Sequence, residues 1–410
     1  MINPLQTLGK LKTINADYWQ KVHSAKKDGK FIAYTNAFSP VELLYSMDFL
    51  PVYPENHAVI LGAKRQNDKA MKAASEMGYS PNLCSYARTD LGDMHAKTSP
   101  VGGMPRPDLL VVSNCQCGTL HKWFEAIARA YGVPMVLLDV PHAGNSADGG
   151  DEEAKAYVRA QLEQLVALME GISGRPFNMG RLGEVLRESQ TASRLWEEVL
   201  GLGARVPAPL TVFDQFIAMA PIVAQRGTRI ATDFYRELVS ELRERAAAGV
   251  GSVEPERFRL FWDNLPMWPE LRPLSDLLAR KGVALVSSFY THCWTNLAVD
   301  PADPFDQWAG DWAGFRYATH INLERRIAAY ADLAERFKLD GFLFHSNLSC
   351  KMISQFIPDL KQALHEKTGL PGLVIDADHN DPQHYSMSSL VLRIEAFIEM
   401  LGPTRCRAAS

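Results

Sequence analysis

Short apolar runs alternate with amphipathic stretches in two separate blocks of the sequence, and this alternation constrains the fold more than any other feature. Strands that alternate with helices in this way form βαβ units, and successive βαβ units build a parallel sheet. The pattern therefore predicts an α/β protein with a parallel sheet in each block. The strand candidates are the residues 31–38, 107–114, 133–141, 257–263, 283–290, 341–347 and 369–378.

The stretch between the two blocks, about 153–247, has almost purely helical spacing of its apolar residues. A chain of 410 residues is also longer than one domain normally is. We therefore expect two flavodoxin- or Rossmann-like parallel-sheet domains joined by a helical region. The predicted division is an N-terminal α/β domain (1–150), a helical region (151–250) and a C-terminal α/β domain (251–410).

Composition excludes several classes of function. Hydrophobic residues make up 47% and charged residues 22%, and the net charge of −4 comes without a basic run, so a nucleic-acid partner is not expected. No apolar run reaches membrane-spanning length and the N-terminus lacks an apolar signal region, so we expect no membrane association and a cytoplasmic location. Neither a GxxxxGK[ST] phosphate loop nor a GxGxxG after a strand is present.

The cysteines carry the strongest chemical signal. Cys117 follows the apolar run LLVVS, Cys350 follows GFLFHS, and each directly precedes a predicted helix. The carboxyl ends of parallel strands form the ligand crevice of an open α/β sheet. We therefore expect the two domains to present Cys117 and Cys350 to a shared cleft. Cys84, which follows a predicted helix and precedes a predicted Gly-containing loop, is the third thiol. The partial positive charge of a helix N-terminus is expected to lower the pKa of such a thiol.

Three other interpretations of these cysteines stay open at this point. Each can be a small buried core residue, since free cysteine is among the most buried residue types. A zinc site is also conceivable, completed by His345, His292 or His142, although the close paired spacing of structural zinc sites is missing. Finally, Cys115 is an alternative to Cys117 because it lies only two residues away.

Three stretches of the sequence resemble a known superfamily. They are LCSYARTDLG (83–92), CGTLHKWFEAIARAYGVPMVLLDVPH (117–142) and the region from GFLFHSNLSCKMIS to RIEAFIEML (341–401). With them the chain resembles the large, cluster-bearing subunit of the 2-hydroxyacyl-CoA dehydratase and ATP-dependent benzoyl-CoA reductase superfamily. The resemblance implies a [4Fe-4S] cluster held by Cys84, Cys117 and Cys350, with one iron that no protein thiolate binds. The family's usual CDT is replaced here by Cys117-Gly118-Thr119, a departure that puts the hydrogen bonding near the cluster in doubt.

The resemblance also implies a reaction and partners. An ATP-dependent iron–sulfur activator would pass single electrons to a heterodimer of this chain and a homologous large subunit, and these would pass them to an acyl-CoA substrate. YPENHAV (53–59) and LCSYAR look closer to the aromatic-ring reductases, so a benzoyl-CoA reductase-type oxidoreductase is the first expectation. The alternative is a 2-hydroxyacyl-CoA dehydratase subunit that works through a ketyl radical. A further alternative is a non-catalytic scaffold or electron-relay subunit.

Several polar residues near the predicted strand ends are candidates for the site. Glu55, His57 and His345 can act as acid or hydrogen-bond donor to a radical anion, and each has a structural role as its alternative. Ser346, together with Asn347, can donate to cluster sulfurs.

The remaining chemistry-bearing residues are expected to be structural. Asp376, Asp378 and Asp381 fit loop and cap hydrogen bonding, and Cys293 and Cys406 fit a structural role. The helical region is expected either to contact the partner subunit or activator, or to serve as a solvated spacer.

Overall fold

A computed structural model of the protein describes residues 2–141, 152–295, 302–313 and 322–402. The described chain forms two four-stranded sheets in which all pairs are parallel, and this confirms the predicted fold class. The first sheet has the order β2-β1-β3-β4 and the second the order β6-β5-β7-β8. The strands are β1 (Phe31–Thr35), β2 (Phe49–Val52), β3 (Leu109–Ser113), β4 (Met135–Leu138), β5 (Phe258–Asp263), β6 (Val283–Ser288), β7 (Gly341–Asn347) and β8 (Gly372–Ala377).

Both sheets have the same topology. The strand that comes first along the chain, β1 in one sheet and β5 in the other, takes the second position in the order of strands across the sheet. The chain therefore reverses direction across each sheet between β1 and β3, and again between β5 and β7. Such a reversal opens a crevice at the carboxyl ends of the two central strands, because the connections leave toward opposite faces. All five residues of β3 are buried, as expected for a strand covered on both faces.

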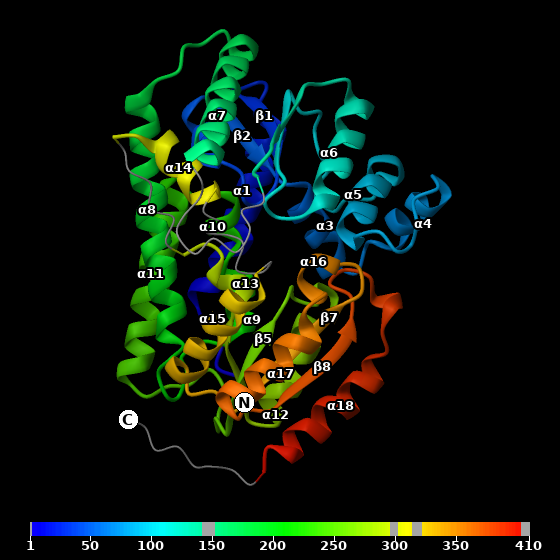
Figure 1. The fold of residues 1–410 in the computed structure, drawn as a ribbon, viewed down its shortest axis with the longest axis vertical. Helices are drawn as coiled ribbons and strands as arrows, with labels where there is room; N and C mark the ends of the chain where they lie inside the picture. The colour runs from blue at the N-terminus through cyan, green and yellow to red at the C-terminus, as the bar shows by residue number, and fades with distance from the viewer. Residues whose placement is uncertain (1, 142–151, 296–301, 314–321, 403–410) are drawn as a thin grey trace.

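The helices cover both sheets and connect the two halves of the molecule (Figure 1). The long helices α8 and α11 pack against each other and run along one side of the molecule, past both halves. In the N-terminal half the helices are α1 (Leu11–Ser24), α2 (Val41–Ser46), α3 (Pro54–Ala63), α4 (Asp68–Glu76), α5 (Ser85–Ala96) and α6 (Gly118–Tyr131). The helical region holds α7 (Glu152–Ser173), α8 (Met179–Leu202), α9 (Val212–Ala218), α10 (Ala220–Ala224) and α11 (Arg229–Ala247). The C-terminal half holds α12 (Leu271–Arg280), α13 (Phe289–His292), α14 (Pro304–Ala313), α15 (Leu323–Arg336), α16 (Lys351–Ser354), α17 (Ile357–Thr368) and α18 (Met387–Met400).

The predicted division into three regions stays a prediction. The strands of the two sheets fall in the first and third regions, and α7 to α11 fall in the second. The boundary at 150/151 lies outside the described residues. Helix α14, which belongs to the third region by sequence, packs against α7 of the second.

Two segments near the expected site are helical where the sequence predicted otherwise. Glu55 and His57 were expected near strand ends, but they lie in the first turns of α3, which begins with Pro54. The segment after Cys84 was expected to be a loop because it contains Gly92, yet it forms α5. A Cβ on Gly92 would lie 1.8 Å from the carbonyl oxygen of Ala70, so this glycine permits close packing of α5 on α4.

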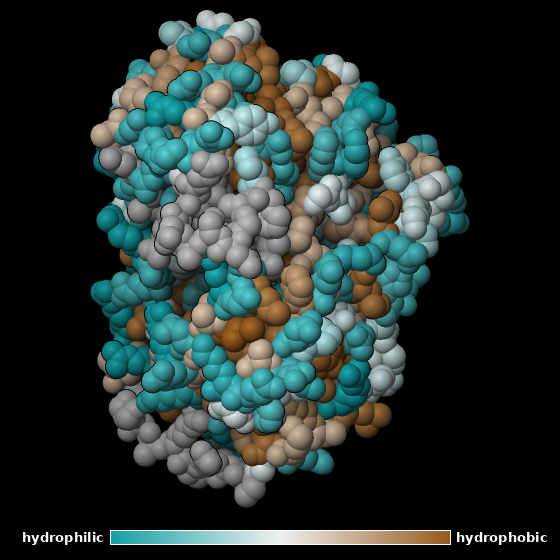
Figure 2. Space-filling view, in the orientation of Figure 1, coloured by the Kyte–Doolittle hydropathy of each residue, from teal (hydrophilic) through white to brown (hydrophobic). Residues whose placement is uncertain are grey.

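Apolar side chains are concentrated in the cores around the two sheets. Figure 2 shows hydrophilic residues over much of the face in view, with apolar residues in a strip between α6 and α7 and in smaller patches lower on the same face. None of the helices in the described part of the chain combines the length and the apolar character needed to cross a bilayer.

Candidate functional site

Three cysteines from distant parts of the sequence line one cavity between the two halves of the molecule. Cys84, Cys117 and Cys350 are each the N-cap residue of a helix, of α5, α6 and α16 respectively. Cys117 follows β3 and Cys350 follows β7, the strands beside the two reversals of sheet order. The cavity encloses about 980 Å³ of space not filled by protein atoms, part of it open to solvent.

Backbone N–H groups in the first turn of each helix favour the thiolate form of the cysteine that precedes it, although none of the three sulfurs accepts a cap hydrogen bond in this structure. The N–H groups that lower the pKa are those of Tyr86 and Ala87 for Cys84, of Thr119 and Leu120 for Cys117, and of Ile353 for Cys350. These N–H groups have no partner within their own helix, so the sulfur is their natural acceptor. The sequence thus folds each thiol into a small nest of N–H donors.

Burial governs the protonation of these thiols, contrary to the expectation from the sequence. Loss of solvent raises the pKa of Cys117 to about 11 and that of Cys350 to about 12, and it raises the pKa of Cys84 well above its ordinary value. The N–H donors lower the pKa of each thiol, but the effect of burial is larger. The prediction that the helix N-termini give these cysteines a low thiol pKa is therefore wrong for the metal-free protein. The three thiols are therefore protonated at neutral pH in the metal-free protein, and any metal that bound them would have to displace the protons.

The other two cysteines in the described residues have different surroundings. Cys115 is buried outside the cavity, where its sulfur accepts a hydrogen bond of 2.8 Å from Ser113 Oγ. Cys293, expected to be structural, lines the same cavity as the three thiols, and its sulfur lies 3.6 Å from the carbonyl oxygen of Phe289. Its position five residues after the end of β6 is the signal that could have placed it there. Cys406 lies outside the described residues.

The zinc interpretation gains no support from the geometry. Within the described ranges, no three His, Cys, Asp or Glu side chains approach closely enough to hold one metal ion. The Nδ1 atom of His292 lies 2.8 Å from the Ser288 carbonyl oxygen, and that of His345 lies 2.8 Å from the Leu265 carbonyl oxygen. Neither histidine lines the cavity, and His142 lies outside the described residues.

Glu55 lines the cavity and is held in a fixed orientation. Its Oε2 accepts the N–H of Ala37 at 3.0 Å and its Oε1 accepts Nε2 of Gln116 at 2.6 Å. Gln116 in turn accepts a hydrogen bond from Asn36, the residue that follows β1. Burial raises the pKa of Glu55. No other Asp, Glu, His, Lys or Arg of the described chain lines the cavity.

The other candidates for acid–base or cluster contacts lie away from the cavity. His57 is buried, with Nδ1 2.8 Å from Asp90 and Nε2 3.5 Å from Asp93. His345 and Ser346 lie within β7, and neither lines the cavity. Side chains in the body of a strand point into the layers above and below the sheet, whereas Cys350 lies beyond the strand end and faces the crevice.

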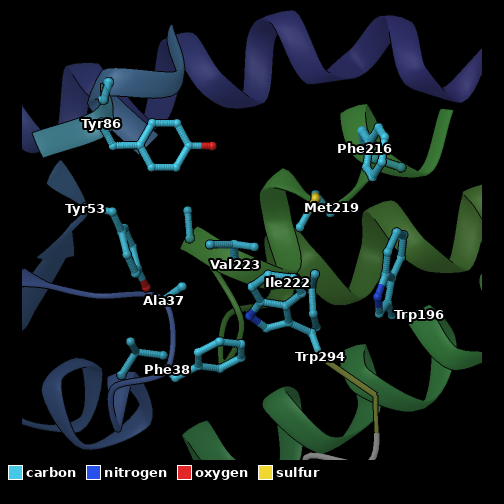
Figure 3. Close-up of a cluster of buried hydrophobic side chains, with 14 of the residues drawn as sticks. Ala37, Phe38, Tyr53, Tyr86, Trp196, Phe216, Met219, Ile222, Val223 and Trp294 are labelled. Atoms are coloured by element: carbon cyan, nitrogen blue, oxygen red, sulfur yellow. The ribbon is translucent and has the colours of Figure 1, made fainter. Parts of the chain in front are cut away.

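Aromatic and aliphatic side chains form most of the remaining wall. Figure 3 shows Phe38, Val223 and Trp294 gathered from three separate segments. The rings of Phe38 and Trp294 stack with their centroids 5.4 Å apart. The indole N–H of Trp294 is buried and has no hydrogen-bond acceptor among the described residues.

A buried carboxylate joins the loops that carry two of the thiols. Asp378 accepts hydrogen bonds from Ser85 Oγ at 2.6 Å and from Ser349 Oγ, the neighbours of Cys84 and Cys350. Burial alone would raise the pKa of Asp378, but the neighbouring His379, followed by these donors and nearby backbone N–H groups, holds it well below its usual range. Asp378 also accepts the N–H groups of the loop that follows it, which confirms its predicted loop role.

Comparison with known proteins gives one consistent result. Residues 36–401 match the model of the family described as 2-hydroxyglutaryl-CoA dehydratase, D-component. The chain is 30% identical to the (R)-2-hydroxyisocaproyl-CoA dehydratase alpha subunit of Clostridioides difficile, over 94% of each chain. It is 29% identical to the alpha subunit of lactoyl-CoA dehydratase from Anaerotignum propionicum, over 93% of each chain. Identity to a benzoyl-CoA reductase subunit of Thauera aromatica is 28%, over 98% of this chain and 95% of that one. The chain therefore belongs to the 2-hydroxyglutaryl-CoA dehydratase D-component family, within the superfamily that its motifs indicated.

Proposed function

We propose that the chain is the [4Fe-4S]-bearing subunit of a 2-hydroxyacyl-CoA dehydratase, with the cluster bound by Cys84, Cys117 and Cys350. The observation that carries the proposal is the convergence of these three thiols on one cavity from three helix N-termini. Thiolates are the ligands that iron–sulfur clusters require, and the N–H nests would stabilise the negative charge of a bound cluster.

The residues present fit such a cluster better than a single ion. The three sulfurs line one cavity but are not close enough to bind one metal ion together, and a cluster presents several iron atoms to separate ligands. When bound, the cluster supplies a one-electron carrier and one iron without a protein thiolate. The chain contributes the enclosed site and the hydrogen-bond donors around the sulfurs.

Glu55 is the residue we assign to proton transfer. Dehydration of a 2-hydroxyacyl thioester removes a proton from carbon 3 and the hydroxyl group from carbon 2, and these leave together as water. Because burial raises the pKa of Glu55, its carboxylate is a stronger base than that of an exposed glutamate. The hydrogen bonds from Ala37 and Gln116 hold the carboxylate at the cavity wall. It can take the proton from carbon 3 and give it to the departing hydroxide.

The cavity wall favours an uncharged, hydrophobic acyl group. No Lys or Arg of the described chain lines the cavity, so a second carboxylate on the substrate would be buried without a cation. The aromatic side chains of Phe38, Tyr290 and Trp294 instead offer apolar contact area. The indole N–H of Trp294, which has no acceptor within the described chain, is a donor for a substrate oxygen.

The comparisons support the dehydratase alternative better than the ring-reductase expectation drawn from YPENHAV and LCSYAR. Dehydratase subunits from several bacteria and one benzoyl-CoA reductase subunit are all similar to this chain. Ring reduction of an aromatic thioester stays the second candidate, because the aromatic wall suits an aryl group equally well. The relatives are each named as one subunit of an enzyme, and we propose a homologous large subunit and an ATP-dependent iron–sulfur activator as partners of this chain.

Iron and acid-labile sulfide per chain, measured on anaerobically purified protein, test the cluster first. We expect about four of each in the wild type and a large loss in Cys84→Ser, Cys117→Ser and Cys350→Ser. Cys115→Ser is the matched control, since Cys115 lies two residues from Cys117 but outside the cavity. Wild-type protein without iron, or iron content that the three substitutions leave unchanged, would refute the ligand assignment.

A second experiment separates the two reaction classes. The chain is purified with its partner subunit, and 2-hydroxyacyl-CoA and benzoyl-CoA thioesters are supplied with a reducing activator. Dehydration returns the electron, so many turnovers follow from a catalytic amount of reductant. Ring reduction consumes two electrons for each product molecule. Product without stoichiometric consumption of reductant identifies the dehydratase.

A further inference from the structure

We propose that a cleft on the side of the N-terminal half binds a phosphate-bearing small molecule of about nucleotide size. This cleft, which we call the lateral cleft, is lined by side chains from α1, α2, β2, α8 and the start of α11. It offers about 700 Å³ of water-accessible space, within the usual range of ligand pockets, about 300–1,000 Å³. The inference goes beyond the proposed function and does not depend on it, because no described residue lines both the lateral cleft and the cavity of the three thiols.

The charged side chains around the lateral cleft leave an excess of positive charge. Three carboxylates line it, against the five cations Lys21, Lys30, Arg181, Arg187 and Arg229. Each carboxylate already lies near an arginine, in the pairs Arg181–Glu184 (2.7 Å), Arg229–Glu188 (3.7 Å) and Arg175–Asp48 (2.8 Å). Lys21, Lys30 and Arg187 form no ion pair with any residue that the structure describes. The cleft is therefore suited to an anion, unlike the thiol cavity, which no described Lys or Arg lines.

The side chain of Gln225 points to a ligand in the lateral cleft. Gln225 lines the cleft and is only 4% exposed. Its side-chain amide has no hydrogen-bond partner within the described part of the chain. Buried polar groups are nearly always paired, so an unpaired amide at the wall of a cleft calls for a partner from outside the chain. The amide carries two N–H donors, and phosphoryl oxygens are acceptors for them.

The first turn of α11 adds backbone donors beside Gln225. Thr228, the N-cap residue of α11, gives the helix no side-chain cap, because its Oγ1 donates to the carbonyl oxygen of Gln225 at 2.8 Å. The first turn of α11 also contains no acidic residue, and Arg229 and Ile230 of this turn line the cleft. The first N–H groups of a helix have no partner within the helix, and together with the positive end of its dipole they favour an anion. Gln225, Arg187 and the start of α11 therefore offer three kinds of phosphate ligand: an amide, a guanidinium group and backbone N–H groups.

Calorimetric titrations of the full chain test whether such a ligand binds. The probes are pyrophosphate and ADP, and adenosine is the control without a phosphoryl group. We expect saturable binding of ADP or of both probes, and none of adenosine. Equal affinities for pyrophosphate and ADP would assign recognition to the phosphoryl groups, and tighter binding of ADP would add a contact to the nucleoside. The absence of saturable binding of both probes overturns the inference.

Two variants test whether the ligand binds in the lateral cleft. Arg187→Gln removes a cation without an ion-pair partner, and Gln225→Leu removes the buried amide. Each should weaken the binding about tenfold, as expected for the loss of a hydrogen bond to a charged group. Arg194→Gln is the matched control, because Arg194 is also exposed on α8, about two turns beyond Arg187, but lies outside the cleft. Binding that Arg187→Gln and Gln225→Leu both leave unchanged would overturn the assignment of the ligand to this cleft.

Hydrogen exchange of the wild type avoids dependence on the folding of Gln225→Leu. The backbone N–H groups of Arg229 and Ile230 should exchange more slowly when pyrophosphate is added, because the ligand would accept hydrogen bonds from this turn. The first turn of α15 is the control, because the side chain of Asn322 already caps it, and its exchange should not change. Exchange in the first turn of α11 that saturating pyrophosphate leaves unchanged would refute its role in the site.

Discussion

Asp378 accepts a hydrogen bond from Ser85 at 2.6 Å, and this bond joins the C-terminal half of the molecule to the N-terminal half beside Cys84. The same carboxylate accepts Ser349 Oγ beside Cys350. One buried side chain therefore sets the positions of two of the three thiols. The arrangement explains why a site assembled from distant segments can be rigid before any cluster is bound.

The substitution Asp378→Asn should weaken both the apo-protein and its ability to hold iron. The asparagine side chain is uncharged and has one acceptor oxygen, so it cannot replace the carboxylate that accepts hydrogen bonds from both serines. Hydrogen bonds to charged groups contribute about 1.5–3 kcal/mol each. We expect a loss of about 3 kcal/mol in the free energy of unfolding at pH 7, measured by urea denaturation, together with reduced iron per chain. Asp376→Asn is the control, because Asp376 is exposed and contacts the surface residue Arg393.

The effect of this substitution should depend on pH in a defined direction. The pKa of Asp378 lies below its usual range in the folded protein. Its contribution is therefore present above the unfolded pKa of about 3.9 and is lost as the pH falls further. The difference between the wild type and Asp378→Asn should shrink below about pH 4. A difference that grows in acid would contradict the assignment of the charged form.

The sequence predicted the local structure well wherever a single strand or helix determines that structure. β7 has the predicted bounds, 341–347, because its apolar run is flanked by Gly341 and a polar turn. The places of Cys117 and Cys350 also followed from the sequence, since each comes just after a buried strand. The carboxyl ends of parallel strands share one edge of the sheet, whatever the details of packing.

Features that depend on contacts between distant segments could not be predicted. Glycine is typical of loops, so the sequence around Gly92 predicted a loop. Only the close contact of α5 with α4 explains why a glycine lies within this helix. Cys293 and Trp294 enter the cavity because α13 turns the chain back after β6. The thiol pKa values depend on how deeply the two halves bury the sulfurs, and this burial outweighs the helix N-termini.

Gly92→Ala should destabilise the protein and disturb the site at a distance. The new Cβ would lie 1.8 Å from the Ala70 carbonyl oxygen, so α5 must move away from α4. Overpacking of this kind costs about 1–3 kcal/mol, and because Cys84 caps α5, iron content should fall as well. Gly171→Ala in α7 is the matched control, since nothing lies within 4 Å of its added Cβ and alanine favours a helix. Thermal unfolding and iron analysis of both variants check the prediction.

His292 should make the stability of the apo-protein depend on pH in the mildly acidic range. Burial lowers the pKa of His292 to about 4, whereas an unfolded histidine has a pKa of about 6.5. The unfolded state binds more protons between these values, so stability falls as the pH is lowered from about 6.5 toward 4. We expect the stability advantage of the wild type over His292→Gln to shrink by about 2 kcal/mol over this range. Denaturation at a series of pH values measures it, and an advantage that does not vary with pH would count against the prediction.

Glu55→Gln should abolish most of the activity while leaving the cluster in place. Glutamine preserves the shape of the side chain, and its Oε1 can still accept from Gln116 or from the backbone of Ala37, so the wall of the cavity persists. It cannot accept a proton from carbon 3, and loss of a general base costs about 10²–10⁴-fold in rate. We therefore expect wild-type iron content with a rate lower by this factor.

The pH profile separates this role from a structural one. Since burial raises the pKa of Glu55, the acidic limb of the wild-type rate profile should lie at a higher pH than an exposed glutamate would give. This limb should vanish in Glu55→Gln. His57→Gln is the contrasting variant, because His57 is bound to Asp90 outside the cavity. It should change the free energy of unfolding while leaving the acidic limb in place. An acidic limb that persists in Glu55→Gln and disappears in His57→Gln would transfer the proton-transfer role from Glu55 to His57.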